Sequence, residues 1–231
     1  PPRSTLFPYT TLFRSTSLSK GWKLIERFSE DIDIVINRGA LGFSNDNALE
    51  TAPSRKQKDK CLKELHKACE KCIKGNIGPI LREAIAAAIP TPLSWDLVDD
   101  PDDPDGQTLL FTYPTAFPAK AVYLRQTVKI EMGARSDTEP SETIQISPYI
   151  SDVYPKLLPE SKIEVRAVKP KRTFWEKAML LHEETFRPVS RKRRKEYMAR
   201  HYYDLYKLIE KGIAQDAMAD ESLFSRVASH R

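Results

Sequence analysis

The sequence predicts an α+β fold with a mixed sheet and a helical C-terminal part. Short runs rich in β-branched residues, such as residues 31–36 and 162–167, are interspersed with longer segments of helical periodicity, without a strict βαβ order. The 231 residues are 40% hydrophobic and 30% charged, which suits a folded domain and argues against wholesale disorder. No run approaches the roughly 18–20 apolar residues of a helical membrane span, so no such span is expected.

Helices are predicted where apolar residues recur every three or four positions. In the first helix these residues are Leu18, Trp22 and Ile25, and Thr16 or Ser17 can cap it. The expected helices cover residues 16–27, 53–89, 174–184, 191–210 and, more weakly, 216–229.

Strands are predicted where short β-rich runs are bounded by turn residues. The expected strands cover residues 31–36, 108–113, 122–132, 143–146 and 162–167. Gly75 and Gly78 should interrupt the helix over residues 53–89. The segment 90–106 holds four prolines and six aspartates, which predicts a loop or the edge of an insertion.

The first fifteen residues differ from the rest of the chain. PPRSTLFPYTTLFRS contains no acidic residue, repeats TLF and lacks the continuous apolar run of a secretory signal. Residues 5–15 resemble, at eleven consecutive positions, the translation of a common DNA-sequencing adapter. The alternative is a genuine Pro/Thr-rich tail. We therefore expect residues 1–15 to be an artefact and native sequence to begin near Thr16.

Three cysteines suggest a metal site at first sight. Cys61, Cys69 and Cys72 share one arc of the predicted helix with leucines, and His66 lies just off that arc. Zinc needs four ligands with matching geometry, so a buried apolar helix face is the favoured interpretation. An odd number of cysteines also argues against a disulfide scaffold and fits a reducing compartment.

Two aspartates give the strongest chemical signal. Asp31 and Asp33 are two residues apart on a predicted strand, so they point to the same face, while Ile32, Ile34 and Ile36 point to the other. Two carboxylates side by side repel unless a cation lies between them. Oxygen ligands suit Mg²⁺ that also contacts a phosphate. A D-x-D pair alone also fits an exposed strand end, so the flanking sequence is needed to choose between a metal site and a strand end.

The flanking sequence resembles a known family. TSLSKGWKLIERFSEDIDIVI (residues 16–36) is similar to the core of the AbiEii/AbiGii toxin-type nucleotidyltransferases, within the DNA polymerase β superfamily. RTFWEKAMLLHEE (172–184) and RHYYDLYKLI (200–209) resemble two further motifs of the family, in the same order. The resemblance covers roughly residues 16–209. It implies a polymerase-β-like nucleotidyltransferase core over 16–170, with a helical insertion at about 53–89, and a C-terminal helical part over 171–231 that completes the active site.

The chain departs from the family pattern just before Thr16. Family members carry a glycine pair where this chain has Arg14 and Ser15, and those glycines let backbone N–H groups approach nucleotide phosphates. Arg14 and Ser15 should hold side chains where phosphate oxygens sit. We therefore expect the printed chain to be at best feebly active.

The resemblance implies a catalytic set of carboxylates and one lysine. Asp31 and Asp33 would hold Mg²⁺, or Mn²⁺, against the triphosphate of an NTP. Glu131, on the neighbouring β-rich run, would help to bind the metal or activate the attacking hydroxyl; an outward-facing strand charge is the alternative. Lys177 would contact the triphosphate as a point charge. Asp204 would orient Lys177 or the nucleobase.

The start of the first helix supplies the expected nucleotide contacts. Thr16, Ser17 and Ser19 lie there, and their hydroxyl groups could donate hydrogen bonds to phosphate. Catalysis would then consist mainly of positioning and charge neutralisation.

A basic segment suggests the acceptor. Residues 162–207 hold 14 Lys and Arg against six Asp and Glu, and the densest run is RKRRK at 191–195. Tyr197, Tyr202 and Tyr203 lie beside it, so a nucleic-acid backbone could dock there. A solvated helix face is the alternative.

The resemblance implies a cytoplasmic, prokaryotic toxin of a toxin–antitoxin or phage abortive-infection system. It would transfer a nucleotide to RNA, such as a tRNA end, or to protein, with a cognate antitoxin as partner. Two alternatives stay open: a non-catalytic nucleic-acid- or antitoxin-binding remnant of the fold, and a nucleotidyltransferase that acts on a small molecule. The basic segment argues against the second. Neither the NTP nor the acceptor is identified by the sequence.

Overall fold

A computed structural model of the chain describes residues 7, 9–29, 31–44, 49–116, 126–156, 162–188 and 195–229. The chain forms two compact units, each with its own core. Unit 1 comprises Pro1–Thr11 and Glu30–Asp137, and unit 2 comprises Leu12–Ser29 and Thr138–Arg231. The boundary at residue 170 expected from the sequence stays a prediction.

Unit 1 is built on a mixed sheet. Its strands are β2 (Ile32–Ile36), β3 (Asp96–Asp99), β4 (Thr108–Thr112) and β5 (Thr127–Gly133), and the first residues of β1 (Thr10–Leu12) also belong to it. The order of hydrogen-bonded neighbours is β3-β4-β5-β2-β1. The β2 and β5 strands are parallel, whereas β3, β4 and β5 pair antiparallel. Both kinds of pairing in one sheet confirm the predicted mixed α+β architecture.

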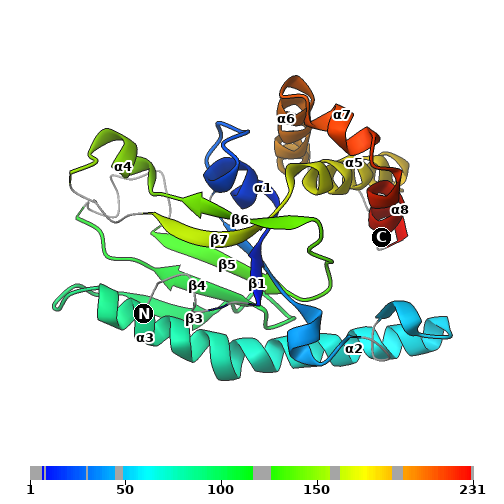
Figure 1. The fold of residues 1–231 in the computed structure, drawn as a ribbon. Helices are drawn as coiled ribbons and strands as arrows, with labels where there is room; N and C mark the ends of the chain where they lie inside the picture. The colour runs from blue at the N-terminus through cyan, green and yellow to red at the C-terminus, as the bar shows by residue number, and fades with distance from the viewer. Residues whose placement is uncertain are drawn as a thin grey trace. The chain divides into compact units, whose positions relative to one another are not determined.

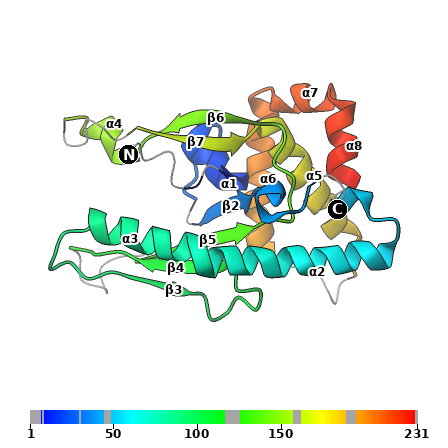
Figure 2. The ribbon, with the colours of Figure 1, turned by 60° about the horizontal axis from the view of Figure 1, so that its bottom comes forward.

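A long helical segment covers one face of this sheet. It consists of α2 (Arg55–Cys72), η6 (Ile73–Ile77) and α3 (Gly78–Ala88), and it runs along β3, β4 and β5 in Figures 1 and 2. Ser54 caps α2 by accepting a hydrogen bond from the Gln57 backbone N–H. The predicted interruption at Gly75 and Gly78 coincides with η6, a stretch of wider helical turns.

The core of unit 1 lies between these helices and the sheet. Cys69 is fully buried in it, and Cys61 and Cys72 pack against it, which confirms the predicted apolar helix face. From the sheet, Ile130 and Met132 of β5 contribute to the same core. Because successive side chains of a strand alternate between faces, residues 129 and 131 point to the opposite, polar face.

Unit 2 combines a small sheet with helices. Its strands β6 (Ser141–Ile146) and β7 (Ile163–Val168) pair antiparallel. The last residue of β1, Leu12, pairs with Ala167 of β7 in parallel orientation. Its helices are α1 (Arg14–Thr16), η2 (Ser17–Gly21), α4 (Tyr149–Val153), α5 (Pro170–Phe186), α6 (Lys195–Glu210), α7 (Ile213–Met218) and α8 (Glu221–Ser229). The helices α5, α6, α7 and α8 pack against one another (Figure 1). Their core includes Phe174 and Leu208.

The first predicted helix is shorter than expected. It ends at Gly21, and Trp22 turns away so that its indole N–H donates to the Val168 carbonyl at 2.9 Å. A Cβ atom at Gly21 would lie 2.1 Å from Ile144 Cδ1, so a larger residue there would displace the end of that side chain.

Two expectations about loops were incomplete. Residues 96–99 form β3 within the segment predicted as a loop, because Leu97 is buried in the core of unit 1 and pairs with Phe111. The short helix α4 was not predicted either. Parts of two predicted elements, residues 122–125 and 191–194, lie outside the described residues. None of the described helices is long and apolar enough to cross a membrane.

Candidate active site

The polar face of the unit 1 sheet carries a row of oxygen-bearing side chains. Asp33 pairs with Glu131 across the parallel strands β2 and β5, and Glu131 pairs with Thr108 of β4. The row continues to Asp100, whose backbone N–H donates to the Thr108 carbonyl at 3.0 Å. Neighbouring strands are about 4.8 Å apart, so Asp33 and Glu131 are direct neighbours on one face. The structure therefore brings together two of the predicted metal ligands.

A lysine lies on the same face, whereas the third predicted ligand lies just before β2, outside the strand. Asp31 precedes Asp33 by two residues, and Lys129 precedes Glu131 by two. The Lys129 ammonium is 3.2 Å from Glu131 Oε1 and 3.3 Å from Asp100 Oδ2. Partial burial lowers the pKa of Lys129, but its hydrogen bonds and charge interactions with Glu131 and Asp100 outweigh this effect and raise the pKa. Two carboxylates thus share one ammonium.

The donor chemistry of this face fits Mg²⁺. The ion prefers oxygen ligands and is held by one or two carboxylates together with substrate phosphates, which Asp31 and Asp33 could supply. Glu131 would have to exchange its contact with Lys129 for the metal. Among the residues that the structure describes, no group of three or more His, Cys, Asp or Glu is arranged to hold a metal ion.

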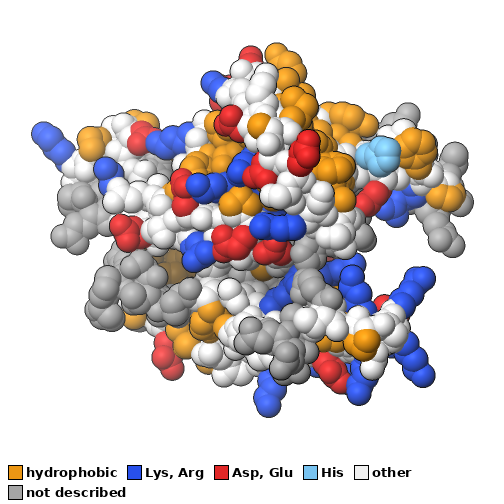
Figure 3. All heavy atoms as spheres, turned by 45° about the vertical axis from the view of Figure 1, so that its right-hand side comes forward, with side chains coloured by type: hydrophobic (Ala, Val, Ile, Leu, Met, Phe, Trp, Pro, Cys, Tyr) orange, Lys and Arg blue, Asp and Glu red, His pale blue; other side chains and the backbone are white. Residues whose placement is uncertain are grey.

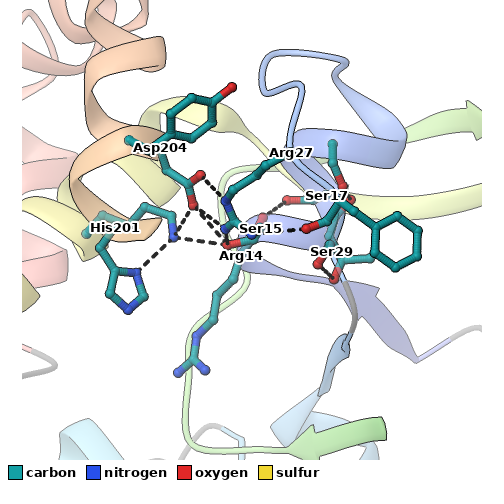
Figure 4. A network of polar contacts seen from close by, with 12 residues as sticks. Arg14, Ser15, Ser17, Arg27, Ser29, His201 and Asp204 are labelled. Atoms are coloured by element: carbon teal, nitrogen blue, oxygen red, sulfur yellow. Dashed lines mark hydrogen bonds and ion pairs between the residues drawn. The ribbon is translucent and has the colours of Figure 1, made fainter. Parts of the chain in front are cut away.

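A second cluster lies inside unit 2, around Asp204 (Figure 4). Asp204 is fully buried, and Arg27 binds both of its carboxylate oxygens at 2.7 Å through Nε and Nη2. Lys177 Nζ is 2.8 Å from Asp204 Oδ2, and the Ser15 hydroxyl donates to the same oxygen at 3.0 Å. Burial alone would raise the pKa of Asp204, but the hydrogen bonds of Arg27 and the charge of Lys177 hold it below its usual value.

All three N–H bonds of the Lys177 ammonium are directed at protein atoms. Besides Asp204, its partners are Ser15 Oγ at 3.1 Å and His201 Nδ1 at 3.3 Å. Only 5% of the Lys177 side chain is exposed, and burial lowers its pKa although Asp204 raises it. Burial also lowers the pKa of His201 to about 4, helped by the nearby charge of Lys177. The imidazole is therefore neutral at pH 7 and can accept the Lys177 hydrogen bond.

The predicted nucleotide contacts at the start of the first helix are arranged differently. The Ser17 hydroxyl is fully buried and donates to the Arg14 carbonyl at 2.7 Å, and the buried Ser19 hydroxyl donates to the Thr16 carbonyl at 3.4 Å. The Thr16 hydroxyl is 3.1 Å from that of Ser29. Phosphate binding by these three residues stays a prediction.

The sequence interpretation missed Ser15, Arg27 and His201. Arg27 stands in the same sequence block as Asp31, and His201 precedes Asp204 by three residues, so both share one face of α6. The three-residue spacing of these two polar side chains on a buried helix face could have indicated that they belong to one cluster. Ser15 was assigned to the foreign N-terminus, and only the fold shows that it contacts Asp204.

The predicted acceptor surface is described only in part. The run at residues 191–194 lies outside the described residues, and so does the side chain of Tyr197. Tyr202 is 58% exposed on α6, whereas the Tyr203 hydroxyl accepts a hydrogen bond from the Glu26 backbone N–H. Hydrophobic side chains gather at the top of Figure 3, which corresponds to the upper part of Figure 1, where α6 and α7 lie.

Carboxylates for a divalent cation and cationic side chains for phosphate are the parts that a phosphoryl- or nucleotidyl-transfer enzyme needs. The family described as "Nucleotidyl transferase AbiEii toxin, Type IV TA system" matches residues 15–231, and the chain belongs to this family. In comparisons with curated proteins and with solved structures, nothing matches the chain. The family assignment confirms the resemblance found in the sequence blocks.

Proposed function

We propose that this chain transfers a nucleotide from an NTP to an acceptor hydroxyl and acts as the toxin of a toxin–antitoxin pair. The family assignment over residues 15–231 supports the reaction class. The observation that carries the proposal is the pairing of Asp33 with Glu131 on one sheet face, with Asp31 two residues away. Such a row of carboxylates needs a cation to offset its mutual repulsion.

The unit 1 carboxylates would serve the reacting centre. When bound, Mg²⁺ supplies a charge that polarises the phosphoryl oxygens and favours in-line displacement at the α-phosphate. Asp31 and Asp33 would hold the ion, and Glu131 would accept the proton of the attacking hydroxyl. The new bond joins the acceptor oxygen to the α-phosphorus, the bond to the bridging oxygen breaks, and pyrophosphate leaves.

The unit 2 cluster would bind phosphate. Arg27 and Lys177 together outnumber the single carboxylate of Asp204, so the cluster has an affinity for an anion.

The acceptor that we favour is RNA, such as a tRNA end. The excess of Lys and Arg over residues 162–207 would attract a polyanion, and the exposed Tyr202 offers a ring on which a base can stack. A protein acceptor is the second possibility. The partner implied by the family is a cognate antitoxin.

The test is a transfer assay with each of the four labelled NTPs, Mg²⁺ and either bulk tRNA or the protein alone. The printed chain is compared with Arg14→Gly/Ser15→Gly, which is expected to be the more active. Asp31→Ala should abolish transfer in both backgrounds. Label on tRNA but not on protein would identify the acceptor class.

Failure of every NTP in both backgrounds would contradict the enzyme proposal for these acceptors. Retained binding of tRNA by an inactive chain would instead favour the non-catalytic alternative. Mn²⁺ in place of Mg²⁺ tests whether the carboxylate face accepts a second oxygen-binding divalent cation.

A further inference from the structure

A single ammonium lies between two carboxylates on the polar face of the unit 1 sheet. Lys129 Nζ is 3.2 Å from Glu131 Oε1 and 3.3 Å from Asp100 Oδ2. Burial lowers the pKa of Lys129, but these two contacts outweigh it and raise the pKa, so the side chain is charged at pH 7. Glu131 is also the neighbour of Asp33 in the pairing of β2 with β5. A divalent cation that binds Glu131 and Asp33 therefore has to displace this ammonium or accept its repulsion.

The two carboxylates that share Lys129 differ in burial. The Asp100 side chain is 7% exposed, whereas that of Glu131 is 40% exposed. Asp100 is also held by the backbone around it. Its N–H donates to the Thr108 carbonyl at 3.0 Å, and its Oδ1 accepts from the Asp102 backbone N–H at 3.0 Å. Asp100 is thus the fixed partner of the ammonium, and Glu131 is the partner that solvent reaches.

The turn after Asp100 is held by a second aspartate. Asp103 Oδ1 accepts from the Asp105 backbone N–H, and Asp103 Oδ2 accepts from the Gln107 backbone N–H, both at 2.9 Å. The Gln107 carbonyl accepts from the Met132 backbone N–H at 3.0 Å, which attaches the turn to β5. Hydrogen bonds within the turn and to β5 therefore set the position of Asp100.

We propose that Lys129 is an exchangeable counter-ion of the cation site, and that Asp100 retains it when a divalent cation binds Glu131. In the free chain, the ammonium offsets the charge of both carboxylates. When the cation binds, the more exposed Glu131 turns to it and the ammonium stays with Asp100. Lys129 and Asp100 are thus positioning residues that act through Glu131. The proposal rests on the proposed function in placing a divalent cation at Glu131.

The experiment measures the binding of Mn²⁺ alone, from the loss of the electron paramagnetic resonance signal of the free ion. The proteins compared are the unchanged chain, Lys129→Met, Asp100→Asn and the double variant. Lys129→Met removes the competing ammonium and should bind Mn²⁺ about tenfold more tightly. Asp100→Asn leaves the ammonium with Glu131 alone and should bind about tenfold more weakly. Asparagine keeps Oδ1 as the acceptor for Asp102, so the turn should be retained.

The double variant separates exchange from the general effect of two nearby charges. If the two charges act independently on the ion, their effects add, and the double variant binds about as the unchanged chain does. If Asp100 acts through Lys129, its charge matters little once the lysine is gone. The double variant should then bind nearly as tightly as Lys129→Met. Additive effects would overturn the proposal.

Asp99→Asn is the matched control, because it removes the same charge one residue earlier in the chain. Asp99 is exposed at the end of β3, and its charge acts on Lys74 of the segment that covers the other face of the sheet. This variant should change Mn²⁺ affinity by less than about twofold. Asp33→Asn should weaken Mn²⁺ binding in every background, which assigns the bound ion to this face.

Lys129→Met keeps the test decisive if Asp100→Asn does not fold, because the Lys129 side chain is 39% exposed. Equal or weaker Mn²⁺ binding by Lys129→Met would overturn the proposal. Mn²⁺ binding needs no nucleotide, so a chain that transfers nothing but binds Mn²⁺ in the expected order supports the exchange. Additive effects would overturn the exchange and leave the proposed function intact, whereas no Mn²⁺ binding by any variant would overturn both the exchange and the cation site.

Discussion

Lys129 in unit 1 and Lys177 in unit 2 each contact a carboxylate, but their surroundings differ in burial and net charge. The Lys129 side chain is 39% exposed and lies among acidic groups, which raise its pKa. The Lys177 side chain is 5% exposed and shares Asp204 with Arg27, and burial lowers its pKa. The same residue type thus lies among carboxylates on a half-exposed face in one unit and beside a buried arginine–aspartate pair in the other.

In the proposed function, each cluster has a ligand of its own. The acidic face would bind Mg²⁺, and the buried cluster would bind phosphate. Burial would strengthen the second interaction, because electrostatic interactions are less screened inside a protein than at its surface.

The largest effect is expected from a carboxylate on the acidic face. Asp33→Asn removes the charge next to Glu131 and should lower Mg²⁺-dependent transfer by at least about a hundredfold. Initial rates with labelled NTP measure it, in the Arg14→Gly/Ser15→Gly background. Asp152→Asn, on the exposed part of α4, is the control and should leave the rate unchanged. A normal rate in Asp33→Asn would remove this residue from the metal site.

Removing charges one at a time should affect stability very differently in the two clusters. Asp204→Asn leaves Arg27 and Lys177 buried without a counter-charge and should cost about 3–5 kcal/mol of unfolding free energy. Lys177→Met leaves a matched Arg27–Asp204 pair and should cost clearly less. Lys129→Met, at an exposed site, should change stability by about 0–1 kcal/mol. Urea unfolding measures all three; a larger loss for Lys177→Met than for Asp204→Asn would refute the surplus of positive charge.

Acid should destabilise the chain through His201. Its folded pKa of about 4 lies below the usual 6.5, so the neutral form is favoured in the fold. The corresponding stability is complete above pH 6.5 and is lost as the pH falls from about 6.5 to 4. His201→Asn keeps an acceptor close to the position of Nδ1 but does not titrate. Unfolding midpoints across this range should show a shallower pH dependence for the variant, and identical slopes would exclude His201 as the cause.

The smallest effect is expected at Arg14. Its φ of 50° lies in the left-handed region that favours glycine, and its charge lowers the pKa of Lys177. Arg14→Gly should stabilise the chain by up to about 1 kcal/mol and raise the pKa of Lys177. Lys23→Gly, at a φ of 51°, relieves a similar backbone conformation without that charge effect. Chemical shifts of the Lys177 side chain during a pH titration would separate the two contributions.

The face of Asp33 was predictable because its alternation with isoleucines is local information. Glu131 was indicated by the resemblance, and only the pairing of β2 with β5 places it beside Asp33. The cluster around Asp204 was not predictable as a whole, because Arg27 and Ser15 are 177 and 189 residues away from it in the chain. The resemblance indicated Lys177 and Asp204, but only tertiary packing shows their shared partners.

Strand β3 shows a different limit of prediction from the sequence. Prolines and aspartates on both sides of residues 96–99 predict a loop, and only the burial of Leu97 against the helices of unit 1 overrides that local preference. Tertiary context therefore determined one strand of the sheet that carries the acidic face.

We propose that the acidic face binds a cation and the buried cluster binds phosphate. The most direct test follows the thermal stability of the unchanged chain, Asp33→Asn and Arg27→Gln with Mg²⁺ alone and with tripolyphosphate alone. We predict that Asp33→Asn loses the stabilisation by Mg²⁺ but keeps that by tripolyphosphate, and that Arg27→Gln does the reverse. Loss of both effects in either variant, or of neither, would contradict the account.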